Sequence, residues 1–188
     1  MDTWNQWKAE LEDACPYPCP LVFGEGAMPP KLMMIGEAPG AEEEKQGHPF
    51  VGKAGKNLSA FLEKVGLTRQ EIYITNVVKL RPYRLSPKTG RPVNRPPKPE
   101  EIQFFLPYLQ KEIQLVNPPL IVTLGNVPLK AVSGQTDAVI GDWHGSLRQS
   151  TDGRPLFALY HPAAIIYNRA LTAVYDRDLE KLKEYLHP

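Results

Sequence analysis

The sequence is poor in cysteine and has no long run of apolar residues. Only Cys15 and Cys19 occur among its 188 residues. Two cysteines cannot make a disulfide framework, and a reducing compartment would leave both as thiols. No apolar run approaches the length of a membrane span, and residues 1–4 show neither the basic region nor the apolar core of a signal peptide. We therefore expect a cytoplasmic protein with no membrane partner.

The common phosphate-binding motifs are also missing. The polar loop at residues 36–44 follows an apolar run, but it has neither a Gly-Lys-Ser/Thr ending nor a Gly-x-Gly-x-x-Gly pattern. Its four glutamates would repel a phosphate. The loop therefore predicts a site for another kind of ligand near the carboxyl end of a strand.

Composition and periodicity together indicate an α/β protein. With 42% hydrophobic and 23% charged residues, the chain has enough material for one sizeable core, and we expect residues 1–188 to form a single domain. Strands are expected at residues 31–35, 72–78, 120–124 and 156–160. Helices are expected at residues 3–14, 55–65, 100–115, 126–132 and 171–186, with Pro107 interrupting the third. This alternation predicts a mostly parallel, four-stranded sheet covered on both faces.

Polar side chains recur where the four predicted strands end. Glu37, Asn76, Asn126 and His161 follow or close successive strands. Parallel strands bring their carboxyl ends to one edge of the sheet, so these groups and Phe50 would form a pocket for a small molecule or a base. Each residue alone has an ordinary explanation as a cap, a satisfied histidine or a core aromatic. Their recurrence at successive strand ends favours a site.

One segment concentrates basic charge. Residues 79–98 contain no acidic residue, and their basic residues are Lys79, Arg81, Arg84, Lys88, Arg91, Arg95 and Lys98. The segment leaves the second strand just after Asn76, so we expect it to border the same crevice. A nucleic acid backbone is the commonest large anion, although many such runs are only solvated loops.

Six short motifs occur in order along nearly the whole chain. They are Gly36-Glu37-Ala38-Pro39-Gly40, residues 47–55 with Phe50, residues 73–79 with Asn76, Asn94-Arg95-x-Pro97, Leu124-Gly125 and His161-Pro162-Ala163. In combination they resemble the uracil-DNA glycosylase superfamily, specifically the family 4 enzymes of bacteria and archaea. The resemblance implies a three-layer α/β/α sandwich and removal of uracil from DNA by cleavage of its N-glycosidic bond, which starts base-excision repair. The expected partner is uracil-containing DNA, single- or double-stranded, bound by a monomer.

The chemistry of base removal assigns roles to the pocket residues. Uracil must leave the stack to be read. Phe50 is suited to stack on the extruded ring, and the Asn76 amide can donate to O4 and accept from N3–H, a pairing that cytosine does not match. His161 can hydrogen-bond O2 as charge builds on the departing base. Gly36 lets the backbone pass close to the ligand.

The sequence offers two candidates for the group that holds the attacking water. Ala38 stands where the best-known members of the superfamily carry a water-orienting aspartate. Glu37 is therefore the first candidate to hold the water, by side chain or backbone, and Glu43 is the second; a carboxylate there would also stabilise an oxocarbenium-like centre. By resemblance, Glu43 instead stands near uracil C5 and excludes the thymine methyl.

Other residues are expected to contact DNA outside the pocket. Four of them surround the first two loops: Lys53, Arg81, Asn94 and Arg95. The run after His161 resembles the loop with which these enzymes wedge the duplex, through Ile165, Ile166, Tyr167 and Arg169. An ordinary helix start explains the isoleucines equally well. Residues 84–93 read as an insertion before Asn94.

The cysteines depart from the family pattern. Family 4 members typically bind a [4Fe–4S] cluster through four cysteines. Cys15 and Cys19 correspond to the first pair, but Leu80 stands where a later cysteine is expected, and the next helix offers Ile102, Phe104 and Phe105. We predict no cofactor, with Leu80 and a phenylalanine filling the space. A zinc site built from Cys15, Cys19 and a histidine has no supporting ligand spacing.

Two functions of other classes stay open. One is a nucleic-acid-binding protein that kept this fold without catalysis. The other is a nucleotide or small-molecule hydrolase that uses the carboxylates with Mg²⁺, although the sequence has no paired-aspartate metal motif.

Overall fold

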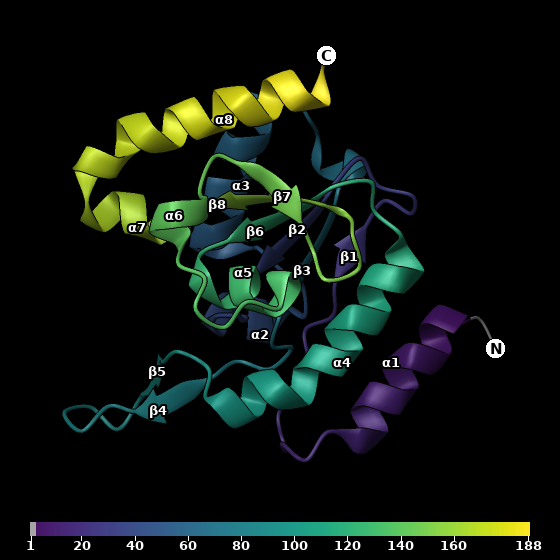
Figure 1. Cartoon of the computed structure of the whole chain (residues 1–188). Helices are drawn as coiled ribbons and strands as arrows, with labels where there is room; N and C mark the ends of the chain where they lie inside the picture. The colour runs from purple at the N-terminus through teal and green to yellow at the C-terminus, as the bar shows by residue number, and fades with distance from the viewer. Residues whose placement is uncertain (1–2) are drawn as a thin grey trace.

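The computed structural model describes residues 3–188 and contains a central sheet between two helical layers (Figure 1). Within this range the sheet has six strands in the order β1-β3-β2-β6-β8-β7. Their bounds are β1 (Glu25–Gly26), β2 (Met33–Gly36), β3 (Tyr73–Asn76), β6 (Ile121–Leu124), β7 (Leu147–Gln149) and β8 (Pro155–Leu159). The parallel strands β3, β2, β6 and β8 are the four predicted from sequence.

The predicted strand count is low because it omits the two antiparallel edge strands. β1 has two residues, and β7 has three that are all exposed, so neither is long enough to show the alternation of apolar and polar residues that marks a strand. Both edges of the sheet are thus closed by short strands, which limits pairing with other chains.

Alternate residues of the central strands enter two separate apolar clusters. Met33 and Ile35 pack in one cluster, while Leu32 and Met34 pack in the other. The first cluster is covered by α1 (Thr3–Ala14), α4 (Pro99–Val116), α5 (Asn126–Ser133) and α6 (Ile140–Trp143). The second is covered by α3 (Gly52–Val65) and α8 (Thr172–Leu186), which lie together on the far side of the sheet (Figure 1). The three-layer α/β/α sandwich is confirmed.

The expected interruption at Pro107 is wrong. α4 runs continuously from Pro99 to Val116 with Pro107 inside it. Pro107 is exposed, while Phe105 and Leu109 on the same helix are fully buried. The carbonyl that loses its N–H partner to proline therefore lies on the solvent side, where water can bond it.

Smaller elements surround the carboxyl ends of the parallel strands. They are α2 (Ala41–Gln46), α7 (Pro162–Tyr167) and the single turn η2 (Arg169–Leu171), whereas the single turn η1 (Arg69–Glu71) directly precedes β3. The predicted insertion at residues 84–93 forms most of an ordered hairpin, β4 (Tyr83–Leu85) and β5 (Pro92–Asn94), that projects from the body (Figure 1). No helix among residues 3–188 is long and apolar enough to cross a membrane.

Candidate functional site

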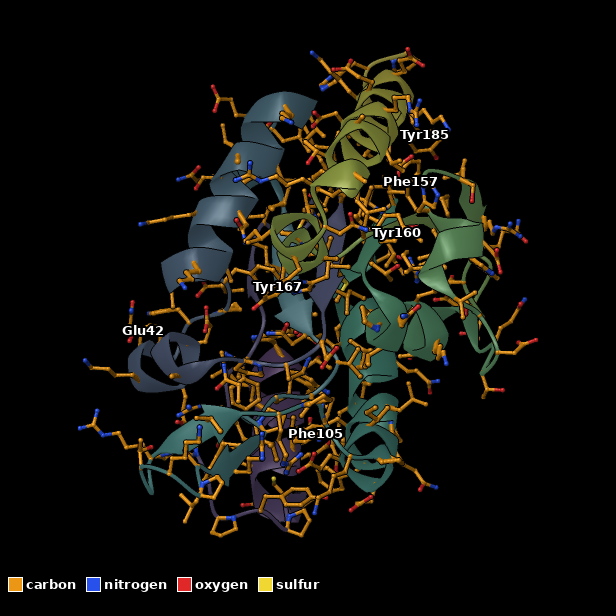
Figure 2. The ribbon with its side chains drawn as sticks, turned by 90° about the vertical axis from the view of Figure 1, so that its left-hand side faces the viewer. Glu42, Phe105, Phe157, Tyr160, Tyr167 and Tyr185 are labelled. Atoms are coloured by element: carbon orange, nitrogen blue, oxygen red, sulfur yellow. The ribbon has the colours of Figure 1, made fainter. Side chains whose placement is uncertain are left out.

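A cavity of about 410 Å³ opens at the carboxyl ends of the parallel strands. It is large enough for a nucleobase and its sugar. Its lining includes Glu37, Ala38, Glu43, Phe50, Lys53, Asn76, Asn94 and His161. The carboxylate, amide, imidazole and aromatic ring expected to meet at one edge of the sheet therefore do meet there. Figure 2 views the molecule from this side, with Glu42 on α2 and Tyr167 on α7.

Gly36 lies against two side chains that line this cavity, Asn76 and Phe50. It pairs in register with Asn76 on the neighbouring strand. A Cβ atom at Gly36 would lie 2.5 Å from Oδ1 of Asn76 and 2.7 Å from Cζ of Phe50. The amide and the edge of the ring thus converge over a position that has no room for a side chain. This explains the glycine at the end of β2.

Asn76 and Glu37 offer unpaired polar groups. Asn76 is only 4% exposed, yet within residues 3–188 neither its side-chain amide nor the Glu37 carboxylate has a hydrogen-bonding partner. Burial raises the pKa of Glu37 above its ordinary value. Polar groups in such surroundings normally have hydrogen-bonding partners. Because these two have none in the protein, we expect a ligand or water to supply them.

His161 has a defined hydrogen-bonding role. It caps α7, where its Nδ1 accepts the backbone N–H of Ala163 at 3.1 Å. An accepting Nδ1 places the proton of the neutral ring on Nε2, which is then a donor. His161 is exposed at the cavity mouth, yet the surrounding protein desolvates its ring and lowers its pKa, so the neutral form is favoured. The cavity is therefore lined by a neutral imidazole that carries its proton on Nε2.

Glu43 is held differently from Glu37. It is buried, its Oε2 accepts the backbone N–H of Gly40 at 3.1 Å, and its Oε1 accepts the backbone N–H of Val51 at 3.1 Å. The carboxylate thereby joins the two ends of the loop that frames the cavity. This geometry fits a positioning role, and the expected part of Glu43 in catalysis stays a prediction.

Phe50 has an unusual backbone that other residues hold in place. Its φ is 53°, in the left-handed region that non-glycine residues seldom adopt. The Arg69 guanidinium donates to the carbonyl oxygens of Pro49 at 2.7 Å and of Phe50 at 3.1 Å, and it pairs with Glu25 at 3.0 Å. Sequence reasoning missed Arg69 and Glu25 because they lie in a single turn and an edge strand with no motif.

Two cations of the basic segment, Arg81 and Arg95, are paired with glutamates. Arg81 donates to Oδ1 of Asn94 at 2.8 Å and pairs with Glu44, and Arg95 makes two bonds to Glu101 at 2.8 and 2.6 Å. These contacts anchor the base of the β4–β5 hairpin. Lys53 is exposed at the rim of the cavity, with no ion pair inside residues 3–188.

Lys79 does not belong to a basic surface, and that expectation is wrong. Its side chain has no exposed surface and pairs with Glu112, which is buried to the same extent. The sequence placed Lys79 at the end of a strand within a run of surface cations. Only the structure reveals the carboxylate that α4 brings against it.

The expected wedge residues lie on and after α7. Ile165 packs against the second apolar cluster, whereas Ile166 is 66% and Tyr167 is 90% exposed. Arg169 follows in η2 and is exposed. Figure 1 places α7 and the β4–β5 hairpin on the same side of the molecule, and both His161, directly before α7, and Asn94, at the end of β5, line the cavity. The wedge role stays a prediction.

The residues near the two cysteines do not fit an iron–sulfur cluster. The chain has two thiols where four are needed, and burial raises the pKa of Cys19, which disfavours the ligating thiolate. Leu80 is buried, and the Tyr17 ring lies 6.0 Å from the Phe104 ring and 6.5 Å from the Phe105 ring between centroids. Across residues 3–188, no three His, Cys, Asp or Glu side chains could share a metal ion. That the protein works without a cofactor stays a prediction.

Comparison with known proteins gives one consistent result. A family model described as "Uracil DNA glycosylase superfamily" matches residues 23–186. The chain is 38% identical to "Type-4 uracil-DNA glycosylase" of Sulfurisphaera tokodaii over 170 residues, which covers 87% of this chain and 73% of that protein. It is 39% identical to the protein of the same name from Pyrobaculum aerophilum over 176 residues, covering 89% and 85%. For the Thermotoga maritima protein of that name, identity is 34% over 177 residues, covering 89% and 88%.

Proposed function

The chain belongs to the uracil DNA glycosylase superfamily, and we propose that it removes uracil from DNA by hydrolysing the N-glycosidic bond, leaving an abasic site for base-excision repair. The observation that carries this proposal is the cavity in which an aromatic ring, an amide, an unpaired carboxylate and an imidazole meet. The chain is similar over most of its length to proteins named type-4 uracil-DNA glycosylase, and this similarity is the reason for proposing uracil in DNA as the substrate.

Recognition depends on Phe50 and Asn76. The extruded ring stacks on Phe50, while the Asn76 amide donates to O4 and accepts from N3–H. Cytosine carries an amino group in place of O4 and an unprotonated N3. Its amino group would face the amide N–H, so two donors would meet, and its N3 would face the amide oxygen, so two acceptors would meet. The absence of a side chain at Gly36 leaves room for the Asn76 amide and the edge of the Phe50 ring to lie close together.

Bond cleavage depends on His161 and Glu37. As the bond to C1′ breaks, negative charge builds on the base, and the Nε2–H of neutral His161 stabilises it at O2. Positive charge builds on the sugar, and the Glu37 carboxylate stabilises it and orients the attacking water. A raised pKa makes Glu37 a better proton acceptor once it is ionised. Glu43 supports the reaction by fixing the loop, through its two backbone bonds.

DNA is held around the mouth of the cavity. We propose that Lys53, Asn94 and the α7 residues Ile166 and Tyr167 contact the strand beside the extruded nucleotide, and that Arg169 contacts its backbone. Arg81 and Arg95 act indirectly, through the hairpin base that they anchor. The protein acts as a single-domain monomer, on single-stranded or double-stranded DNA.

Incubation with labelled uracil-containing oligonucleotides in chelator, followed by alkali, tests the proposal. We expect strand cleavage at the uracil position, and none at cytosine or thymine in matched oligonucleotides. Light scattering of the same preparation reports the oligomeric state. Cleavage that disappears in chelator would favour a Mg²⁺-dependent hydrolase. Binding without cleavage, unchanged by Glu37→Gln and His161→Ala, would favour a silent DNA-binding protein.

A further inference from the structure

The β4–β5 hairpin, residues 83–94, has two chemically different faces. All residues of both strands are exposed. Cross-strand partners share a face, and the register pairs Tyr83 with Asn94, Leu85 with Pro92 and Arg84 with Val93. One face therefore carries Tyr83, Leu85, Pro92 and Asn94, and the other carries Arg84 and Val93. The first face is mainly apolar.

The apolar face is open to solvent. Tyr83 is 46% and Leu85 is 63% exposed. The Arg81 guanidinium lies 5.8 Å from the centroid of the Tyr83 ring, which fixes the ring from one side. An exposed aromatic ring beside a guanidinium is the arrangement on which nucleic acid bases stack.

This face is continuous with the cavity. Asn94, on the same face as Tyr83, lines the cavity itself. A second hollow of about 220 Å³ shares Glu37 and His161 with the cavity and extends to Pro82 and Arg95 at the hairpin base. A strand that enters the cavity therefore has a path to the hairpin.

The hairpin also carries unpaired positive charge. Arg84, Lys88 and Arg91 are exposed, and none of them forms an ion pair anywhere in the described part of the chain. No acidic residue occurs between residues 79 and 99. By contrast, the cations at the hairpin base, Arg81 and Arg95, are neutralised by glutamates. Within the hairpin and its base, the positive charge available to a ligand is therefore confined to the part of the hairpin that projects from the body.

We propose that the hairpin is a second DNA-contacting site for the single strand leaving the cavity: the strand runs along one edge of the two-stranded ribbon, with its bases on Tyr83 and Leu85 of the apolar face and its phosphates reached from the other face and the turn by Arg84, Lys88 and Arg91. This inference rests on the proposed function for the identity of the strand. From Asn94 to the turn the hairpin reaches roughly 16 Å, at about 3.3 Å per residue. That length corresponds to about five stacked nucleotides at about 3.4 Å each along one strand. Uniform charge and continuity with the cavity favour DNA over a protein partner.

The charges are tested by binding to a uracil-free, fluorescently labelled single strand of fifteen nucleotides. The triple variant Arg84→Ala, Lys88→Ala and Arg91→Ala should bind more weakly. The slope of log affinity against log salt concentration should fall in magnitude by about 2, because each single-strand phosphate contact contributes about 0.7. The matched control is Lys130→Ala, Arg177→Ala and Lys183→Ala, which removes three exposed cations that line neither hollow.

The apolar face is tested by Tyr83→Ala with Leu85→Ala in the same assay. Loss of stacking should weaken binding at least about five-fold without changing the salt slope. Thermal melting of every variant, followed by circular dichroism, checks that the fold is intact.

Uracil release separates this inference from the proposed function. For the wild type, the rate on a fifteen-nucleotide substrate should exceed the rate on a uracil-containing trinucleotide, and this ratio should fall in both hairpin variants. If the wild type releases uracil but both variants match it in binding, salt slope and rate ratio, the inference is overturned. If the wild type releases no uracil from either substrate, the proposed function fails, while the uracil-free binding measurements still decide the hairpin.

Discussion

Lys79 and Glu112 form a fully buried ion pair behind the strand end that carries Asn76. The Lys79 ammonium lies 2.6 Å from a Glu112 carboxylate oxygen, 2.6 Å from the Thr75 hydroxyl and 2.5 Å from the backbone carbonyl oxygen of Asn76. The Tyr73 hydroxyl donates to the other Glu112 oxygen at 3.0 Å. Burial lowers the pKa of Lys79, and the adjacent Glu112 carboxylate offsets only part of that shift. The network ties α4 to β3 and fixes the backbone from which the Asn76 amide projects.

Breaking this pair should cost both stability and activity. Lys79→Met leaves a buried, unpaired carboxylate, and we expect the free energy of unfolding in urea to fall by about 3–5 kcal/mol. Lys79→Met with Glu112→Leu should recover most of the stability, because an apolar pair of similar volume is often tolerated in place of a buried ion pair.

The double variant should still show a lower kcat/KM on uracil-containing DNA, since the Asn76 carbonyl has lost its ammonium partner. The control is Lys111→Met on α4, which breaks an exposed pair with Glu10 of α1 and should change stability by less than about 1 kcal/mol. Wild-type kcat/KM in a stable double variant would show that the pair serves the fold alone.

Gly36→Ala should abolish most uracil release while leaving the protein folded. The added methyl would lie 2.5 Å from the Asn76 amide oxygen and 2.7 Å from the Phe50 ring, so one or both must move out of the geometry that reads the base. We expect a loss of at least about 10²-fold in kcat/KM, the cost of misplacing reacting groups by roughly 1 Å.

A matched control exists in α6. Gly141 has no strained backbone angle, and a Cβ there would meet only the Tyr160 hydroxyl at 3.9 Å, so Gly141→Ala should behave as wild type. Equal activity of Gly36→Ala and Gly141→Ala would mean that the base does not contact Phe50 and Asn76 together.

The parallel strands and the pocket could be predicted because each leaves a local signal. Four apolar runs end in Glu37, Asn76, Asn126 or His161, and parallel pairing alone brings three of these side chains into the cavity. Asn126 is the exception: its Oδ1 accepts the backbone N–H of Ile140 at 2.8 Å and serves the start of α6. A polar residue at a strand end does not reveal which way its side chain turns.

The supporting contacts could not be predicted because they join distant segments. Lys79 meets Glu112 across 33 residues, and Arg69 meets Glu25 across 44. Nothing near Lys79 in sequence distinguishes it from the surface cations that follow. The left-handed backbone of Phe50 likewise has no sequence signal, since glycine is the residue expected at such an angle.

Glu37→Gln should lower activity and raise stability at neutral pH. The folded-state pKa of Glu37 is raised above its unfolded value, so ionisation at higher pH destabilises the folded protein. A neutral glutamine removes that cost. The melting temperature should therefore rise at pH 7, and the gain should vanish below about pH 4, where the carboxyl is protonated in both states.

The rate of uracil release should rise with pH over the range in which ionisation of Glu37 lowers stability. Wild-type uracil release should fall as pH decreases through the raised pKa of Glu37, and Glu37→Gln should be slower by about 10²-fold or more and lack this step. Glu63→Gln, an exposed change on α3, controls for the loss of one charge. A variant that keeps the wild-type rate and pH profile would remove Glu37 from the mechanism.

Ile166→Ala should impair uracil release from duplex DNA more than from single strands. Ile166 is exposed on α7, the helix that begins directly after the cavity residue His161 and carries Tyr167 (Figure 2). It has the apolar character needed to fill the space that an extruded base leaves in the stack. A single strand has no duplex stack in which extrusion leaves a gap, so it does not need a side chain to fill one. Because extrusion from a duplex costs a few kcal/mol, we expect a duplex-specific loss of about ten-fold.

Tyr185→Ala is the control, since Tyr185 is also an exposed hydrophobic residue but lies at the far end of α8 (Figure 2). Equal losses on both substrates would identify Ile166 as a packing residue of α7, with the duplex opened by other means.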